Sequence, residues 1–350
     1  MKKLLDRIFI DGLTGMAHGL FATLIVGTII QQIGTYCGGN IGGLIFTLGK
    51  VAAGLTGAGI GAGVARKLDA GHLVIVSAAV VGMIGAFAGD VMSGDIVNDG
   101  SLVLSGPGEP LGAFMAAYIA IEIGILISGK TKLDIILTPL VCIGAGSAVG
   151  LLVGPPISGF MAWLGSLINW GTEQQPFVMG IVVSVLMGMI LTLPISSAAL
   201  GVILNLSGLA AGAATVGCCC NMIGFAVASF RENKFGGLLS QGIGTSMLQV
   251  PNIVRHPQIW IPAIVSSAVL GPVSTMIFHM TNNATGSGMG TAGLVGPLMT
   301  WQVMTQTEAE MIVLVKIILI QFILPAVVTL LISEFMRKKK WIRFGDMKLE

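Results

Sequence analysis

Apolar residues occur along this chain in blocks of about 20, separated by short polar or basic segments. A helix needs roughly 20 mostly apolar residues to cross the hydrocarbon core of a bilayer. The pattern therefore predicts an all-α polytopic membrane protein. Eight blocks are long enough to be spanning helices, and they cover residues 13–36, 41–65, 72–93, 110–129, 133–153, 176–193, 259–281 and 308–335.

The composition excludes a water-soluble fold. Of the 350 residues, 54% are hydrophobic and only 10% are charged, and the mean hydropathy is +0.92. A soluble protein carries roughly a quarter of its residues as charges, because its surface must be wetted. The 51 glycines also favour packed membrane helices, since small residues let helices approach one another closely.

Basic residues between the apolar blocks set the predicted orientation. Under the positive-inside rule, short loops rich in Lys and Arg lie in the cytoplasm. The segment 94–109 carries Asp95, Asp99 and Glu109 and no basic residue, so we place it outside. Both termini then lie in the cytoplasm. The clusters that we place in the cytoplasm are Lys2, Lys3 and Arg7; Arg66 and Lys67; Lys130 and Lys132; Arg231 and Lys234; and Arg337 to Lys340 with Arg343.

Residues 194–230 interrupt the regular alternation of spans and loops. They begin and end on the predicted cytoplasmic side, so they cross the membrane either twice or not at all. Pro194, Ser196, Ser197 and Asn205 break the apolar pattern. Irregular backbone is tolerated at membrane depth only where it is buried in protein or lines a watery cavity. The segment is therefore a pair of short packed helices or a re-entrant hairpin with a partial span, and the total is eight or ten crossings.

Two further segments are apolar enough to enter the bilayer but unusually rich in glycine. They are residues 235–254 on the predicted cytoplasmic side and 282–300 on the outer side. Gly and Ser are typical of ordinary flexible loops, whereas the low charge of both segments favours re-entrant hairpins. We expect a solute pathway to be lined by residues 194–205, 241–252 and 282–293.

The segment 155–170 predicts an amphipathic helix, because its apolar residues recur at helical spacing with Ser and Asn between them. We expect it to lie flat at the outer interface, with Trp163 and Trp170 at headgroup depth. It also divides the chain nearly in half. The predicted organisation is an N-terminal scaffold and dimerisation half at 1–154, a linker at 155–171, a C-terminal transport half with re-entrant segments at 172–336, and a basic cytoplasmic tail at 337–350.

Ionisable residues inside the spans are functional hypotheses, because each costs roughly 3 kcal/mol at the centre of the bilayer. Asp90 lies near a helix end and Lys316 can extend to an interface, so we expect structural roles for both. Glu122 and Lys50 are either a structural ion pair across the first bundle or functional groups. His18 and His279 complete this set.

Polar side chains beside the glycine-rich segments are candidate ligands for a neutral polyhydroxylated solute. Amide, carboxylate and imidazole groups donate hydrogen bonds to hydroxyl pairs and accept bonds from them. The alternative for the cluster near residue 280 is a wetted outer loop. Glu109, within the sequence GPGEP, is either a rigid helix cap or a hydroxyl acceptor. The candidate substrate contacts are His279, Asn282, Asn283, Ser196, Ser197, Asn205 and Gln249, with Glu109 and Glu122 as secondary candidates.

Several functional classes lack their motifs in this sequence. A net charge of +2 argues against a nucleic-acid partner, which needs a clustered basic face. There is no GxxxxGK[ST] loop, HExxH motif or zinc-ligand spacing, so we expect no ATPase, metal or cofactor. Cys218, Cys219 and Cys220 are consecutive, which predicts small packing residues rather than a disulfide framework. No catalytic residues are identified, so the chain is at most the membrane subunit of an enzyme.

Three motifs carry a resemblance to a known family. They are GPGEP at 106–110, PISSAALG at 194–201 and GLAAGAATVGCCCNMIGFAVASFRENKFGGLLSQGIGTSMLQVPNI at 208–253. GPGEP, a first half of about five helices, the interfacial helix and a second half with re-entrant segments together resemble the membrane-spanning IIC component of the sugar phosphotransferase system. More narrowly, the motifs at 194–201 and 208–253 are similar to the stand-alone branch that includes perfringolysin regulator-type proteins.

The resemblance implies a transporter in the bacterial cytoplasmic (inner) membrane. It implies a homodimer in which an elevator-like movement of the second half carries a small polar, sugar-like solute through the lipid bilayer. Separate IIA and IIB proteins are the implied partners. Two other functions stay open. An ion-coupled secondary transporter would use Glu122 or Asp90 as its coupling group, and a membrane sensor without transport would use the tail 337–350 as its output surface.

Overall fold

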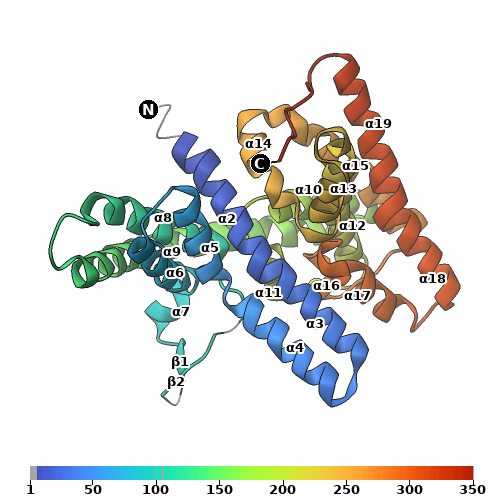
Figure 1. Cartoon of the computed structure of the whole chain (residues 1–350). Coiled ribbons are helices and arrows are strands. Elements are labelled where there is room, and N and C mark those ends of the chain that lie inside the picture. The colour runs from blue at the N-terminus through green and yellow to red at the C-terminus, as the bar shows by residue number, and fades with distance from the viewer. Residues whose placement is uncertain (1–5, 99, 105, 350) are drawn as a thin grey trace. The chain divides into compact units, whose positions relative to one another are not determined.

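The computed structural model describes residues 6–98, 100–104 and 106–349. Lys2, Lys3 and Asp99, which the orientation argument uses, lie outside the described residues. The described chain is almost entirely helical, which confirms the prediction of an all-α polytopic membrane protein. It divides into two compact units, Met1–Met161 (unit 1) and Ala162–Glu350 (unit 2), whose elements are labelled in Figure 1.

Unit 1 is built from helices and one short β-ribbon. Wider helical turns join its first helices into one apolar stretch, Arg7–Cys37, and the next two helices are bent by 51° against each other. The ribbon is antiparallel and pairs Val97 with Leu102 in the predicted outer loop. The elements are α2 (Leu13–Leu20), α3 (Val26–Cys37), α4 (Gly39–Gly54), α5 (Thr56–Lys67), α6 (His72–Ala86), α7 (Ala88–Ser93), β1 (Val97–Asn98), β2 (Ser101–Leu102), α8 (Pro110–Ile127) and the start of α9 (Asp134–Thr172).

Helices in unit 1 meet backbone to backbone at paired glycines. At each pair, a Cβ added to one glycine would overlap the carbonyl oxygen of the other. Only residues without a side chain permit this approach, as in other membrane helix pairs. The pairs are Gly15 with Gly63, Gly19 with Gly59, Gly27 with Gly49, Gly34 with Gly42, Gly57 with Gly82, and Gly85 with Gly112.

The half-buried carboxylate of Glu122 pairs with Arg7 rather than with Lys50, so the proposed pairing with Lys50 is wrong. Arg7 Nε lies 2.6 Å from Glu122 Oε1, and the side chains are 37% and 32% exposed. Lys50 lies on α4 and is exposed. The two helix ends that carry Arg7 and Glu122 come together across 115 residues of sequence, which short-range patterns do not reveal.

Unit 2 consists of long helices interrupted by short broken segments. Lys234 in α13 has non-helical backbone angles, and so the helix is kinked there. Wide or tight helical turns occupy Ser240–Gly244 and Ser246–Gln249. The helices are the end of α9, α10 (Pro176–Thr192), α11 (Ser197–Ile203), α12 (Gly208–Ala228), α13 (Phe230–Leu239), α14 (Val250–Arg255), α15 (Ile261–Pro272), α16 (Ala284–Ser287), α17 (Val295–Met304), α18 (Glu310–Ile317) and α19 (Leu324–Lys338).

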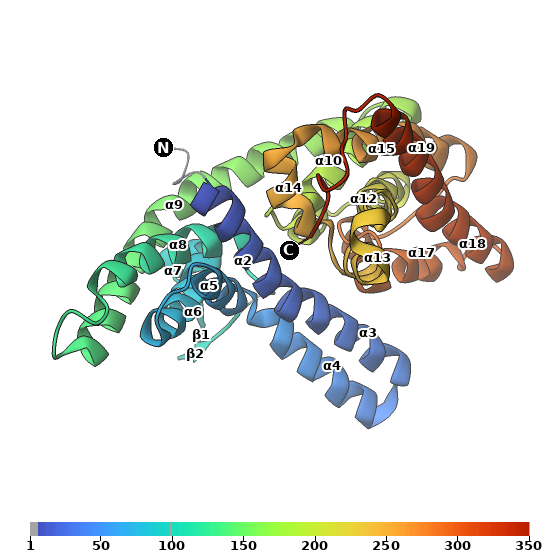
Figure 2. The same cartoon turned by 45° about the horizontal axis from the view of Figure 1, so that its top comes forward.

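The helix α12 lies at the centre of unit 2, in contact with α10, α15 and α19 (Figure 2). Every residue from Ala211 to Met222 is buried. The contacts of α10 with α12 advance in the same order along both helices, because Ser184 lies against Gly217 and Thr192 bonds Asn221. The two helices are therefore parallel, and residues 193–207 must run back between their ends. Residues 194–230 accordingly contain a return segment, whose helix α11 has only seven residues, followed by the long helix α12.

The helical spans agree with the predicted blocks. Among the described residues, six helices are long and apolar enough to cross a membrane, the bent pair Gly39–Lys67 adds a seventh span, and two shorter apolar helices occupy His72–Ala86 and Pro176–Thr192. Each of the eight predicted blocks coincides with one of these. The new span is α12, which lies in the interrupted segment 194–230.

The segment 155–170 is not a separate interfacial helix. It is the C-terminal part of α9, which runs unbroken over 39 residues and contains Pro155 and Pro156. A proline removes one backbone donor, which usually ends a helix in water, but helices of membrane proteins tolerate it. Trp163 and Trp170 are 57% and 51% exposed, and their place at headgroup depth stays a prediction. The unit boundary falls within α9, between Met161 and Ala162.

The C-terminal tail completes the core of unit 2. Met347 is fully buried and Ile342 is 2% exposed, in a cluster with Phe225 and Met336. Nδ2 of Asn233 and Nε2 of Gln249 both donate to the carbonyl oxygen of Met347, at 2.8 and 3.0 Å. The tail is therefore bonded to residues near both ends of the segment 230–255, namely Asn233 and Gln249.

Gly217→Ala should separate α10 from α12. The added methyl group would overlap the carbonyl oxygen of Ser184, and overpacking of this kind destabilises by about 1–3 kcal/mol. Thermal denaturation of the purified protein in detergent should show a clear fall in the unfolding midpoint. Gly236→Ala, whose Cβ would meet open space, is the matched control, and an equal fall in both variants would contradict the prediction.

Met347→Ala should destabilise unit 2 by about 2–5 kcal/mol, because it leaves a cavity in a packed core. Phe344→Ala removes a larger side chain that is 76% exposed, so its effect should stay within about 0.5 kcal/mol. The free energy of unfolding of both variants, measured in detergent, checks this. Similar values for the two would show that the tail is not part of the core.

Candidate solute-binding site

Three breaks in the helices of unit 2 meet the middle of α12. The breaks are residues 192–197 between α10 and α11, 242–246 in the first glycine-rich segment, and 286–291 in the second. The contacts of the first and third breaks on α12 fall within residues 215–222, and Gly242 of the second break lies next to them, against Ile223 and Ala226. We call these four segments together the central zone.

The first break follows from Pro194, which cannot donate a backbone bond to the end of α10. Thr192, the last residue of α10, donates to Asn221 Oδ1 at 3.1 Å and lies 2.9 Å from the hydroxyl of Ser246. The Ser196 side chain caps α11 by accepting from the backbone N–H of Ala199. The polar groups at this break are therefore satisfied by α12 and by the second break.

Asn221 is the main polar residue of the central zone. Its side chain is fully buried. Its Oδ1 accepts from Trp260 Nε1 at 2.9 Å as well as from Thr192, and its Nδ2 donates to Gly217 O at 3.2 Å and Ser267 Oγ at 3.4 Å. A buried amide with partners on three helices fixes their register, because each lost bond would leave an unpaired polar group.

The second and third breaks touch each other on α12. The hydroxyl of Thr291 donates to the carbonyl oxygen of Gly242, and also contacts Met222 Sδ at 3.6 Å. Ser197 Oγ donates to Gly288 O at 2.6 Å, which links the third break to the first. All three breaks are thus joined through hydroxyl and backbone groups.

Glycine makes this convergence sterically possible. A Cβ at Gly288 would collide with the backbone of Ser197. Gly290 has a φ of +50°, and a Cβ there would lie 2.7 Å from Cys218 Cβ. Cys218, Cys219 and Cys220 are fully buried and unpaired, so the prediction that they are small packing residues agrees with their environment.

The central zone offers hydroxyl, amide and backbone groups but no ionised side chain. Residues 192–197, 215–222, 242–246 and 286–291 contain no Asp, Glu, Lys, Arg or His. Neutral donors and acceptors at the ends of broken helices suit a neutral polar solute. Hydrogen bonds to the hydroxyls of the solute can replace the hydrogen bonds that these groups make to one another.

Of the predicted contact residues, only Ser196 and Ser197 lie in the central zone. Asn282 and Asn283 lie at the base of the third break. Asn282 is 1% exposed, and its Nδ2 bonds Thr215 Oγ1, Gly296 O and Thr300 Oγ1 at 2.8–3.1 Å. Asn283 caps α16 by accepting from Gly286 N. In this structure both amides are therefore engaged with the protein.

The other predicted residues are dispersed. His279 and Asn205 are exposed, and both have positive φ values at helix ends. Gln249 is buried and bonds Gln241 and the tail. Glu109 and Glu122 belong to α8 and its cap in unit 1, where Glu109 accepts from Leu111 N at 3.5 Å, the helix-cap role that the sequence allowed.

Sequence reasoning missed residues that the structure places in the central zone. The strongest signal was Asn221, the one amide in a largely apolar run of 21 residues. The others were hydroxyl residues, which membrane helices carry without any functional site. The missed residues are Thr192, Thr215, Asn221, Ser246 and Thr291.

The described residues contain no group of three His, Cys, Asp or Glu side chains that could hold a metal ion. The arrangement defines a class of protein: a multi-pass membrane protein with broken helices that converge on a buried polar zone. The family model described as "Phosphotransferase system, EIIC" matches residues 10–349. The chain belongs to this family, the membrane sugar-transporter component of the phosphotransferase system. A comparison with curated protein sequences gives no match.

Asn282→Ala should destabilise the protein more than Asn283→Ala. Loss of the Asn282 amide removes a donor to three buried acceptors and should lower the free energy of unfolding by about 2–4 kcal/mol. Loss of the Asn283 cap should cost about 1 kcal/mol. Thermal denaturation of the two variants in detergent compares them directly, and an order reversed from this one would exclude the structural role of Asn282.

Proposed function

We propose that the protein carries a neutral, polyhydroxylated, sugar-like solute across the bacterial cytoplasmic membrane through the central zone of unit 2. The single observation that supports this most is the meeting of three helix breaks on α12 without a charged side chain among them. Sugar hydroxyls match such a set of donors and acceptors. Membership of the phosphotransferase system EIIC family supports a carbohydrate rather than another neutral solute.

Ser196, Ser197, Thr192 and Ser246 are the proposed solute contacts. Their hydroxyls bond one another or nearby backbone groups across the breaks, so a small shift between the breaks would free them for a ligand. His279, Asn282, Asn283, Asn205 and Gln249 stay predicted contacts, with Glu109 and Glu122 as secondary candidates.

We infer that unit 2 moves as the transport unit in an elevator-like manner, with separate IIA and IIB proteins as phosphorylating partners. All three breaks lie within unit 2, which makes its own compact set of contacts. Unit 1, with its glycine-paired helices, is the proposed scaffold of a homodimer. The exposed apolar residues Ile41 and Leu44 on α4, at 74% and 63%, suit contact with lipid or with a second copy. Both termini are proposed to be cytoplasmic.

Binding by the central zone is testable without knowledge of the solute. Purified protein in detergent is screened by thermal shift against sugars, sugar alcohols, nucleosides and organic acids, since a ligand of the folded state raises apparent stability. A neutral sugar-like solute should stabilise the protein. Thr192→Val and Ser246→Ala should each weaken its binding by about tenfold, the effect of one lost hydrogen bond. Ser333→Ala on α19, also fully buried, should leave binding unchanged.

The other outcomes separate the alternative functions. Stabilisation by acids alone, or only with a particular ion, would favour an ion-coupled transporter, and uptake should then collapse with the ion gradient. Uptake that needs phosphoenolpyruvate and partner proteins would support phosphotransferase coupling. If no compound in the panel stabilises the protein, a membrane sensor without transport would be favoured.

A further inference from the structure

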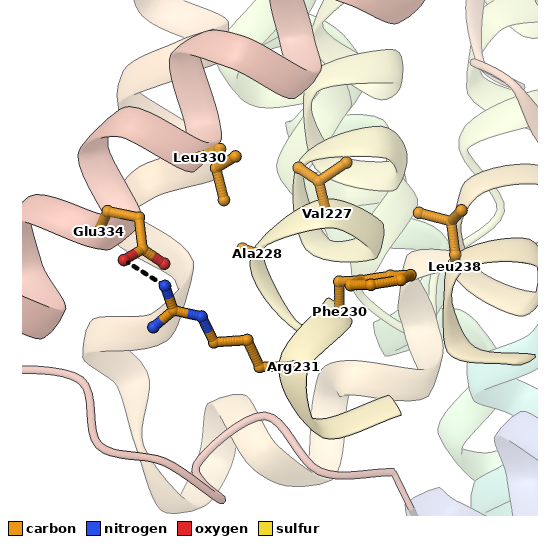
Figure 3. A pocket seen from close by; sticks show the side chains of 7 residues that line it. All are labelled: Val227, Ala228, Phe230, Arg231, Leu238, Leu330 and Glu334. Atoms are coloured by element: carbon orange, nitrogen blue, oxygen red, sulfur yellow. Dashed lines mark hydrogen bonds and ion pairs between the residues drawn. The ribbon is translucent and has the colours of Figure 1, made fainter. Parts of the chain in front are cut away.

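A groove in unit 2 lies outside the central zone and has a distinct chemistry. It has a volume of about 410 Å³ and runs between the end of α12, the start of α13 and the last turns of α19. Figure 3 shows its lining side chains, with Arg231 and Glu334 joined at one side. The lining residues are Val227, Ala228, Phe230, Arg231, Leu238, Leu330 and Glu334.

The wall of the groove is apolar, and its surroundings suit the acyl region of a bilayer. Five of the lining side chains are hydrocarbon or aromatic. Beside them, Leu331 on α19 is 66% exposed, and Phe235 and Leu239 on α13 are 71% and 57% exposed. In a multi-pass membrane protein, exposed apolar side chains of this size are typical of contact with lipid.

The charged rim of the groove lies where the sequence of α19 changes from mainly apolar to charged residues. Val327, Val328, Leu330 and Leu331 are apolar, whereas Glu334, Arg337 and Lys338 follow within two turns. Such a change marks the level of the headgroups, where charged side chains meet the bilayer surface. Arg231 Nη2 donates to Glu334 Oε2 at 2.9 Å, and the two side chains are 61% and 29% exposed.

We propose that this groove binds one phospholipid with an ethanolamine headgroup. Its phosphate accepts from the Arg231 guanidinium, its ammonium donates to the Glu334 carboxylate, and one acyl chain lies along the apolar wall. A guanidinium has five N–H donors and a carboxylate about four acceptor positions, so both groups can bind the headgroup while they stay paired with each other. The adjacent opposite charges match a zwitterion.

The headgroup chemistry favours ethanolamine over its alternatives. A choline headgroup has the same charges but no N–H donor for the carboxylate. A glycerol headgroup carries only the phosphate charge, which Glu334 repels. The site should therefore rank ethanolamine above both choline and glycerol lipids.

Native mass spectrometry of the full-length protein in detergent tests this proposal. Phosphatidylethanolamine, phosphatidylcholine and phosphatidylglycerol with identical acyl chains are added in turn, and the fraction of protein with one bound lipid is measured. The ethanolamine lipid should be retained at least about threefold better than the other two, the size of one exposed charge-assisted contact. Equal retention of the three lipids would overturn the proposal.

Variants assign the effect to this groove. Arg231→Gln should reduce retention of all three lipids to one low level, and Glu334→Gln should reverse the order so that phosphatidylglycerol exceeds phosphatidylethanolamine. Leu330→Trp, which fills the groove, should remove the bound lipid, and Lys340→Gln, at an exposed position, is the control. If Leu330→Trp does not fold, the reversal in Glu334→Gln decides alone. A headgroup order unchanged in both charge variants would mean that the groove is covered by something else, such as a second copy of the chain.

Discussion

Backbone contact at glycine is the constraint on which the rest of this structure depends. In unit 1, glycines face glycines across successive helix pairs, and in unit 2 Gly188 and Gly217 bring α10 onto α12. Lipid is as apolar as the helices, so burial of hydrocarbon alone does not hold them together. Close packing and the bonds made possible by it supply the stabilisation instead.

The same close approach makes the central zone possible. Since α10 and α12 are parallel and in close contact, residues 193–207 must run back from the end of α10 to the start of α12, and they do so in a short segment that is only partly helical. The backbone groups that this path frees need partners, and Ser196, Ser197 and Thr192 supply them together with the other two breaks. Membrane proteins place their solute sites at such breaks, because only there are polar groups available at depth.

Much of the fold was predictable because it depends on short stretches of sequence. The length of each apolar block determines where a span lies, and Pro194 and the glycine-rich segments mark the breaks. The pairing of Arg7 with Glu122 was not predictable, since it depends on the packing of helices far apart in the chain. The direction of α12 relative to α10 could not be predicted for the same reason. The position of Asn221 among the breaks depends on that direction, so it could not be predicted either.

The candidate site was predicted at the level of segments but not of residues. Its three segments were identified from interrupted hydrophobicity, which is a local signal. Which amide faces a solute and which one holds a helix depends on partners: Asn282 bonds three buried acceptors that lie on two other segments. Polarity alone therefore selected residues that stabilise the third break, such as Asn282, as readily as residues in the central zone.

The buried tail has a consequence for how the protein is made. Met347 and Lys348 provide acceptors for Asn233, Gln249 and Asn252, so the segment 230–255 lacks these partners until residues 347 and 348 have been synthesised. Unit 1 is synthesised first and contains its own glycine-paired helices. Unit 2 can therefore reach its final packing only after residues 347 and 348 have left the ribosome, well after all of unit 1 has been synthesised.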